Sequence, residues 1–140
     1  MDNNIKTTVI IPNYNGMKYL PDCLASLEVL EEPFAICIVD NGSADGSVEW
    51  LKQYSCKKKK IQTIFLPENT GFCGAVNTGI LQTDTPYVLL LNNDTRVLPG
   101  FVRALEQNLE DHPDTFSAGE KMLVMKQPEL IDDAGDLYCA

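Results

Sequence analysis

The sequence has little of several residue types on which common functional sites depend. Its 140 residues include one histidine, His112, and five cysteines without a C-x-x-C pair. One histidine cannot build a metal cluster alone, and an odd set of such thiols is typical of a reduced compartment. Only 11 residues are basic against 20 acidic ones, and the resulting net charge of -9 argues against a nucleic-acid-binding protein.

Long apolar runs are also missing from the sequence. None approaches the roughly 18 residues that a membrane-spanning helix needs, and the N-terminus, Met1–Asn4, is too polar for a signal peptide. We therefore predict a cytoplasmic protein. The four lysines of Lys57–Lys60 are the exception to the acidic composition. They predict a solvated loop or, alternatively, a contact with anionic lipid headgroups at the inner face of the membrane.

Short β-branched and apolar runs alternate with segments of helical periodicity. We predict strands at 7–11, 34–39, 61–66 and 87–91, and helices at 19–31, 47–54, 71–81 and 99–112. A further strand is predicted at 116–124, interrupted at Gly119. The pattern indicates one α/β domain with a mainly parallel, Rossmann-like sheet in three layers, covered by helices on both faces.

A polar cluster follows each of the four strands. Because the carboxyl ends of parallel strands share one edge, these loops are expected to line a single cleft, where ligands of open α/β sheets bind. The alternative is that glycine, asparagine and aspartate only form turns there. The clusters are Pro12–Gly16, Asp40–Ser43, Glu68–Gly71 and Asn92–Asp94.

The residue types in these clusters suit a nucleotide bearing a sugar. Asp40 is placed to accept hydrogen bonds from a base or a ribose, or else to cap the next turn, and Gly42 and Ser43 allow close backbone approach. Asn69 and Asn77 suit sugar hydroxyls, with helix capping as the alternative.

Two further features suit a diphosphate and a cation. Gly71 and Gly74 bracket a helix start whose N–H groups could face a diphosphate. Asp94 is the candidate metal ligand, since Mg²⁺ often takes one or two carboxylates and completes its shell with water and phosphate. The alternative is that Asp94 is structural and caps the turn at Thr95.

These motifs together resemble the family 2 glycosyltransferases, which have the GT-A fold. The resemblance covers residues 7–138, and the Asn-Asn-Asp variant with Ile131–Gly135 is most similar to the rhamnosyltransferase-like branch. The matching segments are V-I-I-P-N-Y-N-G at 9–16, I-V-D-N-G-S-A-D-G-S at 38–47, E-N-T-G-F-C-G-A-V-N-T-G-I at 68–80 and L-L-N-N-D-T at 90–95.

The resemblance implies a role for each matching residue. Asp40 would hold the nucleobase, with Gly42 and Ser43 beside it. The other implied donor-site residues are Pro12, Tyr14 and Asn15 around the base, and Asn69, Gly71 and Asn77 in the donor pocket. Asn92, Asn93 and Asp94 occupy the place of the family's Asp-x-Asp motif. Asn92 carries no charge, so Asp94 alone is expected to bind Mg²⁺ or Mn²⁺.

The resemblance also implies the reaction and the partners. A sugar would pass from a nucleotide-sugar donor to a hydroxyl of a glycan, a lipid-linked or another acceptor, with inversion at the anomeric carbon, in glycan or polysaccharide synthesis. The base is expected beyond Ala140, and Asp132, Asp133 and Asp136 are assigned to a turn. Residues 1–140 are therefore expected to be the donor-binding part of a truncated catalytic domain, which binds donor, transfers no sugar and pairs as a homo-oligomer through uncovered apolar surface.

Two other functions share part of this pattern. A non-catalytic nucleotide-sugar-binding module would need the same donor pocket. A sugar nucleotidyltransferase would need a glycine-rich, basic loop after the first strand, where Pro12–Gly16 stands instead. A dinucleotide-dependent dehydrogenase would need G-x-G-x-x-G at that place, and it is missing.

Overall fold

The structure, a computed structural model, describes residues 5–55 and 61–133, which belong to two compact units, 1–100 and 101–140. Lys57–Lys60, the predicted loop or lipid contact, lies outside the described residues. Within the described ranges, no helix is both long and apolar enough to cross a bilayer. The strands are β1 (Thr7–Asn13), β2 (Ala35–Asp40), β3 (Ile61–Phe65), β4 (Tyr87–Leu90), β5 (Met122–Val124) and β6 (Gln127–Asp133). The helices are α1 (Leu20–Glu28), α2 (Ser47–Ser55), α3 (Gly71–Leu81) and α4 (Phe101–Asp111).

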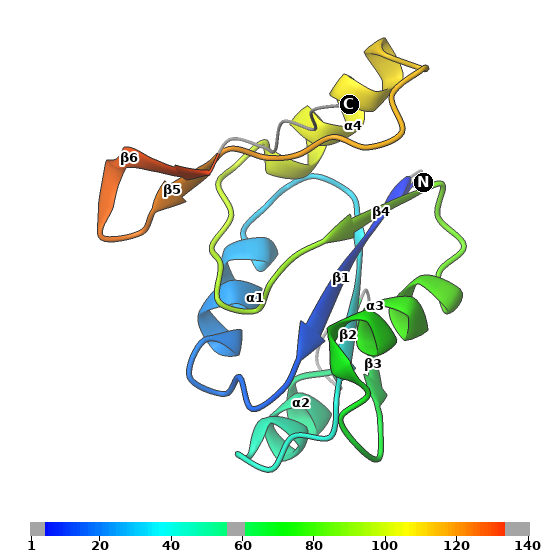
Figure 1. The fold of residues 1–140 in the computed structure, drawn as a ribbon, viewed down its shortest axis with the longest axis vertical. Helices are drawn as coiled ribbons and strands as arrows, with labels where there is room; N and C mark the ends of the chain where they lie inside the picture. Colours follow the sequence, from blue (N-terminus) through cyan, green and yellow to red (C-terminus); the bar gives the residue numbers. More distant parts are fainter. Residues whose placement is uncertain (1–4, 56–60, 134–140) are drawn as a thin grey trace, which may run out of the picture. The chain divides into compact units, whose positions relative to one another are not determined.

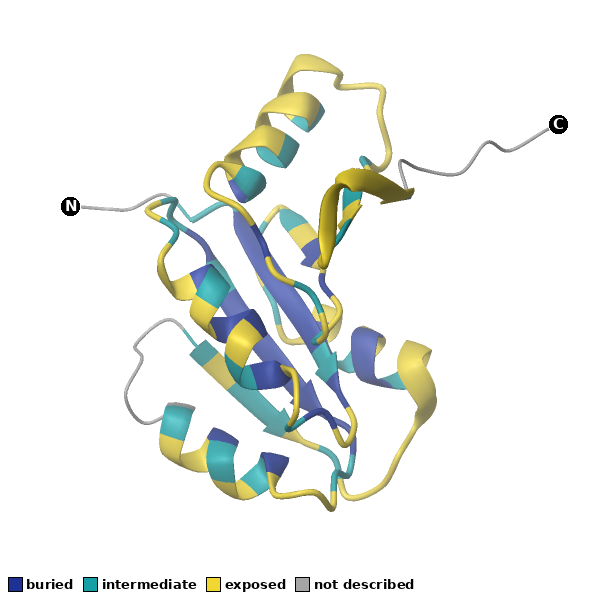
Figure 2. Ribbon diagram, turned by 90° about the vertical axis from the view of Figure 1, so that its left-hand side faces the viewer, coloured by how far each residue is buried: buried dark blue, intermediate teal, exposed yellow. Residues whose placement is uncertain are grey.

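The first unit is built on a four-stranded parallel sheet in the order β3-β2-β1-β4, which confirms the predicted fold class (Figure 1). The central strand β1 pairs with both neighbours, so that Ile10 lies opposite Cys37 of β2 and Leu90 of β4. Val9 and Ile10 point to opposite faces of the sheet, yet both are 0% exposed. The sheet is therefore covered on both faces, and its central strands are dark blue in Figure 2.

The strand order explains which helix covers which face. The chain steps from β1 through β2 to β3 and then returns to the other side of β1 with β4. Right-handed crossovers therefore place α1 and α2 on one face and α3 on the other, and α1 and α3 flank the strands in Figure 1. α3 lies close to the sheet at Gly79, where a Cβ would stand 2.7 Å from Cγ2 of Ile10 and 3.2 Å from Cγ2 of Val39.

β1 runs two residues further than we predicted, through Pro12 to Asn13. Asn41 N donates to Asn13 O, and Leu91 N donates to Ile10 O, so odd-numbered residues bond toward β2 and even-numbered ones toward β4. The missing N–H of Pro12 therefore faces the side on which β4 has already ended. A proline at such a position removes no hydrogen bond from the sheet.

The second unit contains α4 and an antiparallel hairpin of β5 and β6, which is largely yellow, and so exposed, in Figure 2. The strand that we predicted at 116–124 is wrong over most of its length. Only Met122–Val124 is strand, and Phe116 is fully exposed. The two-residue turn at Met125–Lys126 has none of the glycine or asparagine that marks such hairpins in a sequence. Asp132 and Asp133, which we assigned to a turn, lie in β6, and Asp136 lies outside the described residues.

Candidate functional site

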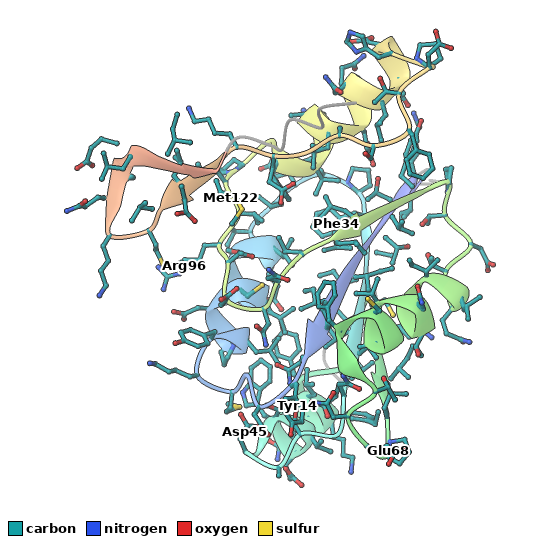
Figure 3. The ribbon with its side chains drawn as sticks, viewed as in Figure 1. Tyr14, Phe34, Asp45, Glu68, Arg96 and Met122 are labelled. Atoms are coloured by element: carbon teal, nitrogen blue, oxygen red, sulfur yellow. The ribbon has the colours of Figure 1, made fainter. Side chains whose placement is uncertain are left out.

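The four parallel strands end at one edge of the first unit, and their loops surround a cleft of about 300 Å³. The cleft lies beside the switch point of the sheet, between β1 and β4, where the direction of strand addition reverses. Figure 3 shows Tyr14, Asp45 and Glu68 along this edge, whereas Phe34, before β2, lies toward the opposite edge. The lining residues are Pro12, Asn13, Tyr14, Asn41, Asn69, Gly71, Phe72, Asn92 and Asn93.

A chain of hydrogen bonds, buried at its centre and partly buried elsewhere, crosses the floor of this edge. Asn13, at the end of β1, is 1% exposed, and its Nδ2 donates to Oδ2 of Asp40 at 2.8 Å and to Oγ of Ser43 at 3.3 Å. Its Oδ1 accepts from Nδ2 of Asn93 at 2.8 Å. One buried amide therefore joins the ends of β1 and β2 to the segment that follows β4.

Asp40 is buried, with 0% exposure, and both of its carboxylate oxygens have protein partners. Oδ2 accepts from Asn13, and Oδ1 accepts from the backbone N–H of Ser43 at 3.0 Å. The second bond is the turn cap that we considered as the alternative role for Asp40. In this arrangement Asp40 orients Asn13 and the Gly42–Ser43 turn, and its carboxylate does not line the cleft.

Asn41 fixes the entry to α3. Its Nδ2 donates to Oδ1 of Asn69 at 2.9 Å and to the carbonyl of Gly71 at 3.0 Å. Its Oδ1 accepts from the backbone N–H and the hydroxyl of Thr70, at 2.9 and 3.0 Å. Thr70 is the N-cap residue of α3 and makes no capping bond of its own, so a side chain from the β2 end holds this helix start.

The loops that follow β1 and β2 are tied together by further hydrogen bonds. Asn15, which has a left-handed φ of 50°, donates its backbone N–H to Oγ of Ser43 at 2.9 Å and accepts from the N–H of Ala44 at 2.8 Å. Asp45 accepts from the backbone N–H of Met17 at 2.8 Å. These bonds hold the loop that carries Tyr14 against the second loop.

Asp45 also caps α2. Its Oδ1 accepts from the backbone N–H of Ser47 at 3.0 Å and from the Ser47 hydroxyl at 2.5 Å. Desolvation raises the pKa of Asp45, but the hydrogen bonds from Ser47 and from Met17 N–H outweigh it. The pKa of Asp45 therefore lies below its ordinary value of 3.8.

Helix α1 holds the turn that follows β4. The thiol of Cys23 donates to the carbonyl of Asn92 at 3.7 Å, and the hydroxyl of Ser26 accepts from the backbone N–H of Val97 at 3.1 Å. Burial raises the pKa of the Cys23 thiol from 9.0 to about 11; hydrogen bonding to Thr95 lowers this pKa and the nearby Asp94 carboxylate raises it. Cys23 is therefore a neutral donor beneath the turn.

The structure brings together half of the residues predicted for the site. The exposed side chains that line the cleft include those of Tyr14, which is 50% exposed, and Asn92. The predicted residues that line the cleft are Pro12, Tyr14, Asn69, Gly71, Asn92 and Asn93. The predicted residues outside the lining are Asn15, Asp40, Gly42, Ser43, Asn77 and Asp94. Of these, Asn77 and Asp94 have exposed side chains, and Asp40 is buried as described above.

Sequence reasoning missed three lining residues, Asn13, Asn41 and Phe72. Asn13 and Asn41 stand within the predicted clusters, but nothing in the sequence separates them from their neighbours. Phe72 is 56% exposed at the start of α3. An aromatic residue directly after the Gly71 of a predicted helix start was the available signal.

The donor set at this edge fits a cation only if a bound molecule supplies further ligands. Among residues 5–55 and 61–133, no group of three or more histidine, cysteine, aspartate or glutamate side chains could hold a metal ion. Asp94 offers one exposed carboxylate in the turn after β4. One carboxylate is sufficient for Mg²⁺ when phosphate oxygens and water complete the shell.

A parallel sheet with a polar cleft at its switch point defines a Rossmann-like α/β protein with one ligand-binding edge. Comparison with known families is more specific, because the profile of the family described as Glycosyl transferase family 2 matches residues 8–129. The chain belongs to this family.

Curated relatives agree with this membership. The chain is 35% identical over 132 residues to the teichoic acid poly(glycerol phosphate) polymerase of Staphylococcus epidermidis, a match that covers 91% of the chain and 18% of that protein. It is 31% identical over 115 residues to the glycosyltransferase GlyA of Streptococcus pneumoniae, a match that covers 81% of the chain and 16% of that protein. The chain thus spans less than a fifth of the length of these two relatives.

Solved structures show that the chain has the GT-A fold. TarS of S. aureus, solved as residues 1–349, aligns with a TM-score of 0.69 and 25% identity over 78% of the chain and 33% of that solved 1–349 chain. The mannosyltransferase PcManGT from Pyrobaculum calidifontis aligns with a TM-score of 0.71 and 19% identity over 79% of the chain and 34% of that protein, a likeness of fold alone. None of these four proteins is named a rhamnosyltransferase, so that branch stays a prediction.

Proposed function

We propose that this chain provides the donor-binding part of a glycosyltransferase, which moves a sugar from a nucleotide-sugar to an acceptor hydroxyl in polysaccharide synthesis. The observation that carries the proposal is the cleft at the switch point, formed by the ends of all four parallel strands. The family membership supports a donor of this class. The TarS structures include a complex with UDP, and PcManGT was solved with GDP-Man and Mn²⁺.

The lining suits the separate parts of a nucleotide-sugar. Tyr14 and Phe72 offer exposed aromatic surface to a flat base. The start of α3 borders the cleft at Gly71 and has no acidic residue in its first turn, so its N–H groups favour a diphosphate. The Asn92 amide can donate to and accept from sugar or ribose hydroxyls. Asn69 can donate its NH₂ group, because its Oδ1 already accepts from Asn41 Nδ2 and caps the Gly71 N–H.

In the proposed reaction the acceptor oxygen attacks the anomeric carbon as the bond to the nucleoside diphosphate breaks. The attacking hydroxyl loses its proton to a base, the leaving diphosphate takes the bonding electrons, and the anomeric configuration inverts. Asp94 would hold Mg²⁺ or Mn²⁺ together with the donor. When bound there, the cation would stabilise the negative charge of the leaving diphosphate.

A non-catalytic nucleotide-sugar-binding module is the second candidate. One observation favours it: the residues that line the cleft include no carboxylate and no histidine, so the described lining offers no base. This module would bind the same donors. A transfer assay on the whole gene product, with UDP-, GDP- and dTDP-sugars and hydroxyl acceptors, separates the two functions because only the enzyme releases the nucleoside diphosphate.

Calorimetry of residues 1–140 with UDP, GDP and dTDP, in Mn²⁺ and in EDTA, tests the donor site directly. We expect one nucleotide to bind more tightly in Mn²⁺, and Asp94→Ala to remove that difference while the thermal unfolding temperature stays unchanged. An unaltered response to Mn²⁺ in Asp94→Ala would remove Asp94 from the site. Asp40→Ala should weaken nucleotide binding in EDTA as well as in Mn²⁺, because it releases Asn13 and the Ser43 turn.

A further inference from the structure

Asn92 and Asn93 are chemically identical neighbours, yet the structure uses their side chains differently. Asn92 is exposed, and no described residue hydrogen-bonds to its side chain; only its backbone carbonyl is engaged, by Cys23 and Thr95. Asn93 is half-buried, and its Nδ2 donates to Oδ1 of Asn13 across the switch point. One amide is free to meet a ligand, and the other joins β1 to the turn after β4.

The direction of this bond follows from the other end of the chain of hydrogen bonds. Both oxygens of Asp40 act as acceptors, Oδ2 from Asn13 and Oδ1 from Ser43 N–H, so the NH₂ group of Asn13 faces Asp40. Oδ1 of Asn13 is then left facing Asn93, which must present its own NH₂ group. A residue at position 93 that can only accept would place two oxygens against each other.

Gly16 provides the space for this contact. A Cβ on Gly16 would lie 2.0 Å from Nδ2 of Asn93 and 2.2 Å from Oδ1 of Asn13, the two atoms that form the bond. Real Cβ atoms do not approach so closely, so a side chain here would push the two amides apart. The glycine in the loop after β1 and the asparagine after β4 therefore belong to one arrangement.

We infer that Asn93 is a positioning residue, which holds the Asn92–Asp94 turn in the geometry that Asp94 needs to share a cation with a nucleoside diphosphate. This inference rests on the proposed function. The turn has other supports, because Ser26 accepts from Val97 N–H and Arg96 forms an ion pair with Asp22. Loss of the Asn93 bond should therefore shift the turn without unfolding the protein.

The sharpest test replaces Asn93 with a residue that brings negative charge but cannot donate. If charge alone governed this edge, Asn93→Asp would strengthen binding of UDP or GDP in Mn²⁺, since it adds a carboxylate beside Asp94. The positioning role predicts the opposite. We expect Asn93→Ala and Asn93→Asp each to lower nucleotide affinity in Mn²⁺ about fivefold, the effect of one lost hydrogen bond, with little change in EDTA.

Asn92→Ala is the matched control. It should lower affinity by the same factor in Mn²⁺ and in EDTA, because its side chain contacts the ligand rather than the turn. A second readout needs no ligand: in ¹⁵N–¹H spectra, Asn93→Ala should shift the side-chain NH₂ signals of Asn13, and Asn92→Ala should leave them in place. Thermal unfolding of each variant verifies that it is folded.

The outcomes separate the two proposals. If the unaltered protein binds none of UDP, GDP and dTDP, the proposed function fails. The side-chain NH₂ signals of Asn13 then decide whether the Asn13–Asn93 hydrogen bond exists. If it binds and Asn93→Asp strengthens binding in Mn²⁺, or both Asn93 variants leave it unchanged, the positioning role is overturned while the donor site stands. Equal losses in Mn²⁺ and EDTA for Asn93→Ala would make Asn93 a ligand contact, which also overturns it.

Discussion

Asn41 offers the most direct test of how the cleft is built. The residue is 4% exposed and makes four hydrogen bonds, two as donor and two as acceptor, all to residues 69–71. Asn41→Ala removes all four and leaves the Thr70 N–H and the Gly71 carbonyl to find water. Asn41→Asp keeps the two acceptor bonds and loses the two donor bonds.

The expected magnitudes follow from these bonds. A hydrogen bond contributes roughly 0.5–1.5 kcal/mol net, and groups at a partly exposed site recover part of that loss by binding water. We therefore expect Asn41→Ala to lower the free energy of unfolding by about 2 kcal/mol and Asn41→Asp by about 1 kcal/mol. With a urea dependence of about 2 kcal/mol per M for a protein of this size, the midpoints fall by about 1 M and 0.5 M.

Trp50 makes this measurement simple. It is the single tryptophan of the chain and stacks on Tyr54 with ring centroids 4.7 Å apart, so its fluorescence should report unfolding. Asn92→Ala is the control for stability, since its exposed side chain holds nothing within the described residues, and a change below about 0.5 kcal/mol is expected. If Asn41→Ala and Asn92→Ala unfold at the same urea concentration, Asn41 does not hold the start of α3.

Two further predictions concern titrating groups. In native protein at pH 8, iodoacetamide should modify the exposed Cys73, and the buried Cys23 should react about 100-fold more slowly than an unperturbed thiol. Raising the pKa of Cys23 from 9.0 to about 11 reduces its thiolate fraction by about that factor. Peptide mass mapping measures both reaction rates, and equal rates would show that Cys23 is accessible. Because the pKa of Asp45 is lowered by folding, its stabilising effect should be complete above pH 3.8 and should fade as the pH drops through the folded-state pKa. The stability difference between the unaltered protein and Asp45→Asn, followed by urea unfolding, should therefore shrink in acid, and a difference that grows there would refute the capping role.

Most of the first unit could be predicted because its sequence is locally consistent. The small-residue helix at Gly71–Leu81 has the bounds that we predicted, and the four strands lie within two residues of their predicted ends. The β5–β6 hairpin could not be predicted, because its turn at Met125–Lys126 lacks a sequence signal. Phe116, at which we predicted the strand to begin, is exposed and lies outside β5. Local sequence patterns do not predict a strand whose position depends only on its pairing with another strand.

The sequence by itself determined that apolar strands alternate with helices and that polar clusters follow each strand, because these features depend on the order of neighbouring residues. It could not determine which asparagines face a ligand and which hold the loops together. Asn13 and Asn41 are buried and hydrogen-bond to neighbouring loops, whereas the side chain of Asn92 is exposed. This difference arises only because strands distant in the sequence meet at the switch point. An amide's role depends on the donors and acceptors that surround it, and the tertiary structure alone brings those together.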